Sequence, residues 1–158
     1  MSHFVTPFII ELVRPYENDG TGQWELHGEF RYFSDLLGRE ITVANRTSTD
    51  LASVPKVPIL YLLYGGRYPR PAAIHDYLCR QGYVRRELCD QVFLEAMQLE
   101  NIIEIDAMRR DGADDEQIDE RARLIEARAQ QMHFGVSLYT KSGRWKKDHH
   151  MPGYEPIG

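Results

Sequence analysis

Residues 71–82 read PAAIHDYLCRQG and residues 85–101 read RRELCDQVFLEAMQLEN, and these two segments decide the fold. The proline that opens the first segment suits the first turn of a helix, where its missing N–H is harmless, and the closing glycine is a natural helix terminator. The second segment carries an apolar stripe at helical spacing: Leu88, Val92, Phe93, Ala96, Met97 and Leu99. We therefore predict two consecutive antiparallel helices, over residues 72–80 and 85–101.

A histidine and a carboxylate stand at matching heights in this predicted helix hairpin. His75 lies seven residues before Gly82 and Asp90 lies eight after it, so each is about 10 Å up its helix at the usual rise per residue. The spacing permits the two side chains to meet. A carboxylate that orients an imidazole makes a general base, so His75 and Asp90 are candidate catalytic residues. The alternative is a buried structural hydrogen bond that fixes the hairpin.

The residues before the hairpin indicate antiparallel β structure. We predict strands over residues 4–13, 24–32 and 40–44, which form a small meander or a pair of hairpins. Residues 45–58 are polar and contain two prolines, which predicts a loop, and residues 57–64 predict a short helix. The fold class is therefore α+β, with an N-terminal antiparallel β-meander packed on the central antiparallel helix hairpin and an additional charged C-terminal helix.

The C-terminal part is highly charged. Residues 102–131 indicate helix interrupted at Asp111-Gly112, residues 133–139 a short strand or docking segment, and the tail from Lys141 irregular structure. We predict a single domain over residues 1–158. Its parts are a β-rich part with the site loop (1–58), the helix hairpin that carries the site (59–101), a charged helical region (102–132) and a C-terminal segment (133–158).

Two further aspartates are candidate metal ligands. Asp50 lies in the polar loop, and Asp76 follows His75, so it points about 100° around the helix, towards the rim. Their oxygens, with loop carbonyls and water, would suit Ca²⁺, whereas one histidine with aspartates suits Zn²⁺ poorly. The alternatives are an Asx-turn carboxylate at Asp50 and a surface carboxylate near a helix start at Asp76.

Composition excludes several classes of protein. The net charge of −5 argues against a general nucleic-acid binder. The sequence has no apolar stretch of about eighteen residues, so we expect no transmembrane segment, and its start does not resemble a signal peptide. Cys79 and Cys89 are too few for a disulfide framework and are expected to be small buried hydrophobic side chains.

Three motifs in order resemble a family from tailed phages and prophages, known as domain of unknown function 1353. They are Thr49-Asp50-Leu51-Ala52-Ser53-Val54-Pro55, then Ala72-Ala73-Ile74-His75-Asp76-Tyr77-Leu78, then Arg86 with Cys89-Asp90, Phe93 and Met97. The resemblance covers residues 4–100 and His133-Phe134-Gly135. It implies a phage origin, and therefore the host cytoplasm or the phage virion as location, but no activity.

The His75-Asp76 pair followed by Asp90 and Phe93 is also similar to the compact prokaryotic and fungal secretory phospholipases A(2). This resemblance implies that His75 is the base that activates water, that Asp90 orients it, and that Asp76 binds Ca²⁺ with Asp50 and the carbonyl of Leu51. It covers about fifty residues. The chain departs from those enzymes in its missing export signal, its two cysteines and the absence of a glycine-rich calcium loop.

Two hypotheses follow. The first is a phage-encoded, phospholipase-like hydrolase of a phospholipid or another ester, with a His75–Asp90 dyad and Ca²⁺ as cofactor. The second is a non-enzymatic phage protein, either a virion or tail component or an inhibitor of a host defence system that binds a host protein. In the second, the His75–Asp90 pair is structural. A metal-dependent nuclease or peptidase would need more ligands than the sequence offers.

Overall fold

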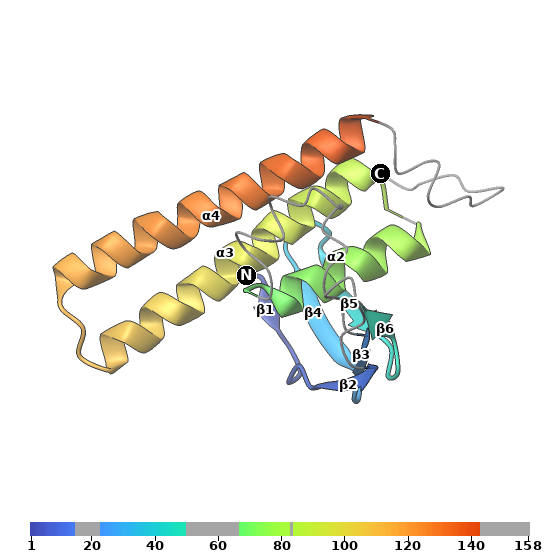
Figure 1. Ribbon diagram of the computed structural model, residues 1–158, viewed down its shortest axis with the longest axis horizontal. Coiled ribbons are helices and arrows are strands. Elements are labelled where there is room, and N and C mark those ends of the chain that lie inside the picture. The colour runs from blue at the N-terminus through green and yellow to red at the C-terminus, as the bar shows by residue number, and fades with distance from the viewer. Residues whose placement is uncertain (15–22, 50–66, 83, 143–158) are drawn as a thin grey trace.

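In the residues that the structure describes, the N-terminal part of the chain folds into two antiparallel sheets, followed by three helices (Figure 1). This computed structural model describes residues 1–14, 23–49, 67–82 and 84–142. The first sheet has the order β1-β4-β5, from strands His3–Phe4, Phe30–Ser34 and Arg39–Val43. The second has the order β2-β3-β6, from strands Ile10–Arg14, Gln23–Leu26 and Ser48–Thr49. The helices are α2 (Pro69–Gln81), α3 (Arg86–Arg110) and α4 (Asp115–Ser142). The α+β class is confirmed.

Two of the predicted strands are each divided between the two sheets. The run over residues 4–13 forms the end of β1 and most of β2, because Pro7 lies between them and cannot donate a ladder hydrogen bond. The run over residues 24–32 forms parts of β3 and β4. Gly28 separates them with a φ of +92°, which a residue with a Cβ rarely adopts. The prediction of one continuous strand in each run is therefore wrong. The third strand is confirmed as β5.

The helix hairpin forms where it was predicted. α2 begins with two prolines in its first turn and ends at Gly82, whose φ of +68° is the left-handed conformation of a helix terminator. The end predicted for the second helix, at residue 101, is wrong. α3 continues to Arg110, because residues 102–110 contain no glycine or proline and Asn101 is buried inside the helix.

From Asp115 to Ser142 the charged C-terminal region is one long helix, α4. The predicted interruption at Asp111-Gly112 is confirmed as the turn between α3 and α4. Asp114 then caps α4: its Oδ1 accepts a hydrogen bond from the Gln117 N–H at 2.8 Å. The strand or docking segment predicted at residues 133–139 is wrong, since these residues belong to α4. They continue the helix's buried stripe, which comprises Ile118, Ile125, Ala129, Met132, Gly135, Val136 and Thr140.

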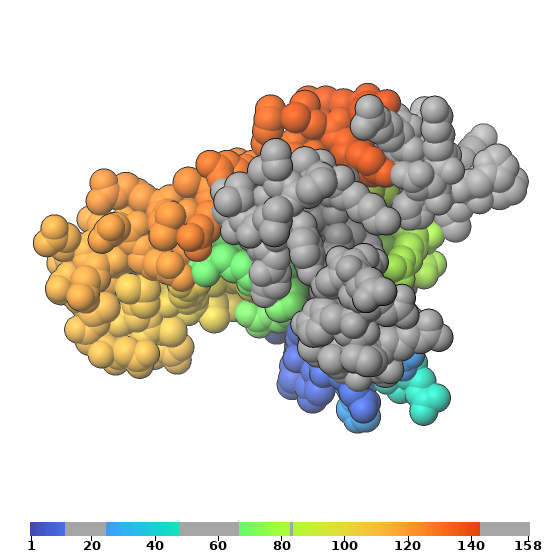
Figure 2. Space-filling model, in the orientation of Figure 1, coloured from blue at the N-terminus to red at the C-terminus, as the bar shows by residue number. Residues whose placement is uncertain are grey.

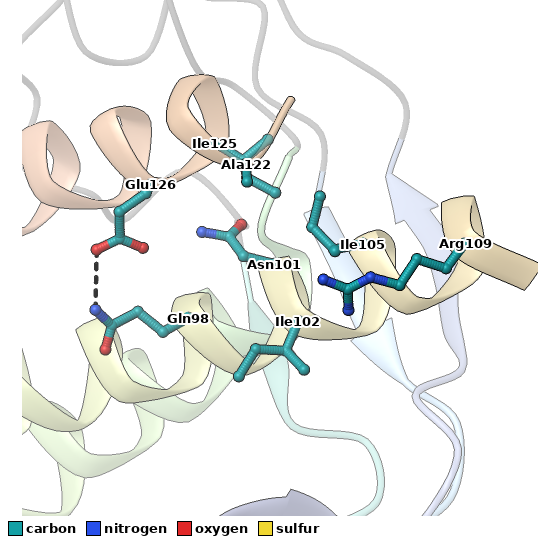
Figure 3. A pocket seen from close by; sticks show the side chains of 8 residues that line it. All are labelled: Gln98, Asn101, Ile102, Ile105, Arg109, Ala122, Ile125 and Glu126. Carbon is teal, nitrogen blue, oxygen red and sulfur yellow. Dashed lines mark hydrogen bonds between the residues drawn. The ribbon is translucent and has the colours of Figure 1, made fainter. Parts of the chain in front are cut away.

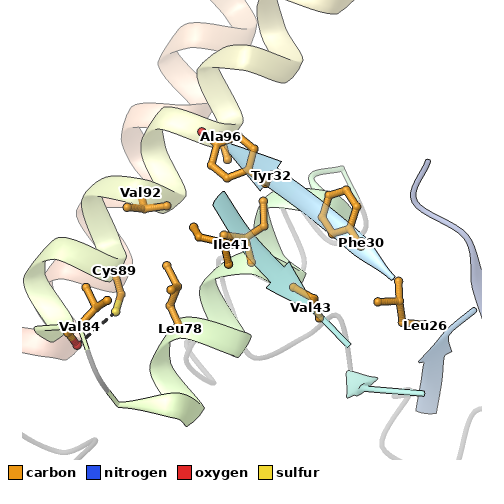
Figure 4. Close-up of a cluster of buried hydrophobic side chains, with 11 residues drawn as sticks. Leu26, Phe30, Tyr32, Ile41, Val43, Leu78, Val84, Cys89, Val92 and Ala96 are labelled. Atoms are coloured by element: carbon orange, nitrogen blue, oxygen red, sulfur yellow. Dashed lines mark hydrogen bonds between the residues drawn. The ribbon is translucent and has the colours of Figure 1, made fainter. Parts of the chain in front are cut away.

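Three groups of buried side chains hold these elements together. The largest lies between the β1-β4-β5 sheet and helices α2 and α3, and includes Phe30, Tyr32, Ile41, Leu78 and Val92 (Figure 4). The second joins all three helices, and the third, built on Ile105, Ile118 and Ile125, lies towards the turn between α3 and α4. That end of the helix pair protrudes well beyond the sheets (Figures 1 and 2).

Several predicted features lie outside the described residues. They are the loop residues Asp50 and Leu51, the short helix at residues 57–64 and the tail from residue 143 onward. In the part of the chain that the structure does describe, none of the helices has both the length and the apolar character that crossing a membrane requires.

One carboxylate on α3 anchors the first sheet to the helices. Glu95 Oε2 accepts hydrogen bonds from the Tyr32 hydroxyl at 2.8 Å and the Ser34 hydroxyl at 2.7 Å. Its Oε1 accepts bonds from the Ser2 hydroxyl at 2.8 Å and the Leu36 N–H at 3.0 Å. Tyr32 and Ser34 are fully buried, so their hydroxyl groups need a hydrogen-bond acceptor inside the core, and Glu95 provides it.

We expect Glu95→Ala to lower the free energy of unfolding by about 3 kcal/mol, because it leaves buried hydroxyl groups without an acceptor. Urea denaturation of the variant and the wild type measures this change. The control is Gln91→Ala, at an exposed position one turn earlier on α3. Equal stability of the two variants would contradict the anchoring role of Glu95.

Candidate functional site

The predicted contact between the two helices of the hairpin is present. His75 on α2 and Asp90 on α3 form a hydrogen bond of 2.8 Å between Nε2 and Oδ1. Gly82 turns the chain between them, and the two residues lie at matching heights because their distances from this turn are nearly equal. Counting residues from the helix terminator showed only that the two side chains could meet, and the structure shows that both face inward.

Both members of this pair are buried. His75 is 3% exposed and Asp90 is 1% exposed. The aromatic ring of Phe93, one turn after Asp90 on α3, packs against the imidazole with a centroid distance of 5.0 Å. The apolar surroundings strengthen the electrostatic attraction between the two side chains, and they also make an isolated charge costly.

The charge state of His75 depends on its neighbours. Burial lowers the pKa of His75, but the neighbouring Cys79 sulfur and the hydrogen bond to Asp90 raise it, so the net pKa is raised from 6.5 to about 10. A hydrogen bond with Cys89 and burial raise the pKa of the Cys79 thiol well above its usual value. Cys79 is therefore neutral at pH 7, which leaves Asp90 as the anionic partner of the imidazolium.

Cys79 lies beside the pair without forming a nucleophile–base arrangement. Its Sγ is 3.5 Å from His75 Nε2, the same nitrogen that Asp90 holds. A thiol activated by a histidine–carboxylate pair needs one ring nitrogen while the carboxylate holds the other. The geometry therefore favours water over the thiol as a nucleophile. Both cysteines are free, with Cys89 buried as expected and Cys79 half-buried.

Within the described residues, both hydrogen bonds to the His75 ring involve Nε2. Nδ1 is then the ring nitrogen that remains for a water or a substrate. Asp90 Oδ2 is also buried without a hydrogen-bond partner among the described residues. A buried carboxylate oxygen in this state has an unmet demand for a donor, which a bound water or a substrate hydroxyl would meet.

Of the expected metal ligands, the structure describes Asp76 only. Asp76 is 8% exposed, so the alternative of a surface carboxylate is wrong, and its role as a metal ligand stays a prediction. Asp50 and Leu51 lie outside the described residues. Among the residues that the structure describes, no group of three or more His, Cys, Asp or Glu side chains is arranged to hold a metal ion.

Sequence reasoning missed two polar side chains on α3. Glu95 accepts four hydrogen bonds from the first sheet, and the Asn101 Oδ1 accepts one from the buried Tyr68 hydroxyl at 2.9 Å. A signal for Glu95 was present, because it lies three residues after Val92 and four before Leu99, in line with the apolar stripe. A polar residue at such a position indicates a buried partner.

These features define an α+β domain with a buried histidine–aspartate pair between two antiparallel helices. A family model matches residues 24–110, more than half of the chain, and carries the description "Protein of unknown function (DUF1353)". The chain belongs to this family. The match includes His75 and Asp90 and ends where α3 ends. No curated protein and no solved structure matches the chain.

We expect the His75–Asp90 pair to stabilise the fold most strongly at low pH. The folded-state pKa is raised, so the stabilisation is full below the unfolded-state pKa of 6.5 and is lost as the pH rises towards 10. The difference in unfolding free energy between the wild type and His75→Gln should therefore shrink by about 4 kcal/mol between pH 6 and pH 10.

Urea denaturation at a series of pH values measures this difference. The His133 side chain on α4 titrates at a lower pH than His75, because burial lowers the pKa of His133 from its usual value. A difference that stays constant from pH 6 to pH 10 would mean that His75 is not held in its charged form.

Proposed function

We propose that this protein is an ester hydrolase in which His75 activates water and Asp90 positions the imidazole. The observation that carries the proposal is the 2.8 Å hydrogen bond between His75 Nε2 and Asp90 Oδ1. It orients the ring and stabilises the imidazolium that forms when Nδ1 takes a proton.

In the proposed reaction, His75 takes a proton from water and later returns it to the leaving group. His75 Nδ1 takes a proton from a water, whose oxygen then attacks the ester carbonyl carbon to give a tetrahedral intermediate. When the carbon–oxygen bond to the alcohol breaks, the imidazolium returns the proton to the leaving oxygen. The products are a carboxylic acid and an alcohol. Asp90 touches neither product and acts through His75 as a positioning residue.

The raised pKa sets the conditions under which this base works. Only a neutral imidazole accepts a proton, and the pKa of His75 is about 10, so the active fraction of the enzyme is small at pH 7 and grows with pH. The proposal therefore includes an alkaline optimum. The substrate class is a phospholipid or another ester, and the phospholipid assignment rests on the resemblance of His75-Asp76 and Asp90 to the phospholipases.

The proposal assigns calcium binding to one described residue, Asp76. Asp76 is the single expected ligand that lies in the described residues, and these residues contain no cluster suited to a metal. The steps above therefore use no metal ion. If calcium binds, Asp76 would supply one carboxylate, and the ion would supply charge that polarises the ester carbonyl.

We expect His75→Gln to abolish hydrolysis of a fluorogenic phospholipid and of a short-chain nitrophenyl ester, because no other group replaces the base at Nδ1. In the wild type, kcat/KM should rise about tenfold for each pH unit from 7 towards 10, as the neutral fraction of a single base does. Initial rates across pH measure both effects. His27→Gln, at an exposed position, is the control and should retain full activity.

The His75→Gln variant should lose activity but should still give a cooperative melting transition. If His75→Gln hydrolysed both esters at the wild-type rate, or if neither ester were hydrolysed by the wild type at any pH, the proposed base would be wrong.

We expect a calorimetric titration with CaCl₂ to show one binding site in the wild type and none in Asp76→Asn. The reason is that the variant keeps the side-chain shape but loses the anionic oxygen that Ca²⁺ prefers. Asp106→Asn, at an exposed position on α3, is the matched control. Equal titration curves for the wild type and Asp76→Asn would remove Asp76 from the metal proposal.

A second candidate function is favoured by the burial of the same pair. A histidine and an aspartate that are 3% and 1% exposed, with the histidine pKa raised, are what a structural ion pair requires. The protein would then be a non-enzymatic phage protein, a virion or tail component or an inhibitor of a host defence system. Absence of turnover, together with co-purification with virions or with one host protein, would favour this candidate.

A further inference from the structure

A second concave site lies between α3 and α4, away from the His75–Asp90 pair. It is a cavity of about 440 Å³ in which side chains of both helices face one another (Figure 3). Asn101, Ile102 and Ile105 line it from α3, and Ala122 and Ile125 line it from α4. Asn101 is eleven residues after Asp90 on the same helix, which separates the two sites by about 16 Å.

The polar group at the back of this cavity is only half satisfied. Asn101 is 6% exposed, and its Oδ1 accepts the hydrogen bond from the Tyr68 hydroxyl. The same hydroxyl also lies 3.3 Å from the Ile125 carbonyl oxygen, a second acceptor. The other end of the Asn101 amide, Nδ2, has no hydrogen-bond partner among the described residues. A buried N–H donor without an acceptor costs stability, and Asn101 is one of the residues that line the cavity.

The charges at the two ends of the cavity cancel. Glu126 lies at one end and Arg109 at the other (Figure 3). Each already has partners: Glu126 Oε1 accepts bonds from Gln98 and Gln130, and Arg109 pairs with Asp106. The walls between them are aliphatic. The lining therefore carries no net charge, and Asn101 Nδ2 is a buried donor without a partner among the described residues, which favours a neutral ligand with an acceptor oxygen.

We infer that this cavity binds a neutral acyl compound, an amide or an ester with a short aliphatic chain. Its carbonyl oxygen accepts a hydrogen bond from Asn101 Nδ2, and its chain packs against Ile102, Ile105 and Ile125. The volume lies within the range of small-molecule sites. This site is independent of the His75–Asp90 pair and of the hydrolase proposal.

The test uses three eight-carbon probes that differ only in their head group: octanamide, octanoate and octylammonium. Titration of the ¹⁵N-labelled full chain follows the side-chain NH₂ signals of Asn101 and the methyl signals of the isoleucines. We expect octanamide to shift these signals in a saturable manner. Octanoate and octylammonium should bind about tenfold more weakly, because each brings a charge that the lining does not compensate.

Two matched variants locate the site. Ile102→Ser removes part of the aliphatic wall and should weaken octanamide binding about tenfold. Ile103→Ser makes the same change at the neighbouring exposed position, which does not line the cavity, and should leave binding unchanged.

The inference is overturned by any of three results. They are unshifted Asn101 signals at saturating octanamide, equal binding of the three probes, and equal weakening by the two variants. Ile102 is about half exposed, so both serine variants are expected to fold, and each is checked by its melting transition. A hydrolase assay of Ile102→Ser separates this site from the proposed active site, since its activity should equal that of the wild type.

Discussion

The hydrogen bond between His75 and Asp90 is the interaction on which the centre of this fold depends. It closes the α2–α3 hairpin in the apolar interior, where two partners that were not matched to each other would each destabilise the chain. The hairpin in turn positions α3, which the first sheet approaches through Glu95 and α4 approaches along its buried stripe. Helix α3 thus carries Asp90, which binds His75, and Glu95, which anchors the first sheet. It also forms one wall of the cavity.

The fold satisfies its buried polar groups to different degrees, and these differences indicate where ligands belong. Glu95 is the satisfied case, because four donors from the sheet surround its carboxylate. Asp90 and Asn101 are each satisfied on one side only, at Oδ1, and keep Oδ2 and Nδ2 without a partner in the described part of the chain. Structural anchors and binding groups on α3 differ in this respect, although both are buried polar side chains.

Much of this arrangement was predictable from local sequence signals, and the errors have physical causes. Counting residues to Gly82 placed His75 and Asp90 at the same height and so permitted their contact, since a helix has a fixed rise per residue. The burial of Asp76 did not follow, because a position on the helix surface does not reveal which other segment covers it. The split of the first strands depended on Pro7 and Gly28, single residues inside otherwise continuous β patterns. Residues 133–139 contain β-forming side chains, but their stripe is in phase with the helix before them, and tertiary packing overrode local preference.

The central claim is that Asp90 holds Nε2 of His75 and leaves Nδ1 as the base. The most direct measurement is ¹⁵N NMR of the ring-labelled histidines near pH 10, where half of the His75 rings are neutral. The account predicts that the neutral ring carries its proton on Nε2 and that Nδ1 has the chemical shift of a bare nitrogen. A neutral ring protonated on Nδ1 would contradict it, because that nitrogen could not accept a proton from water.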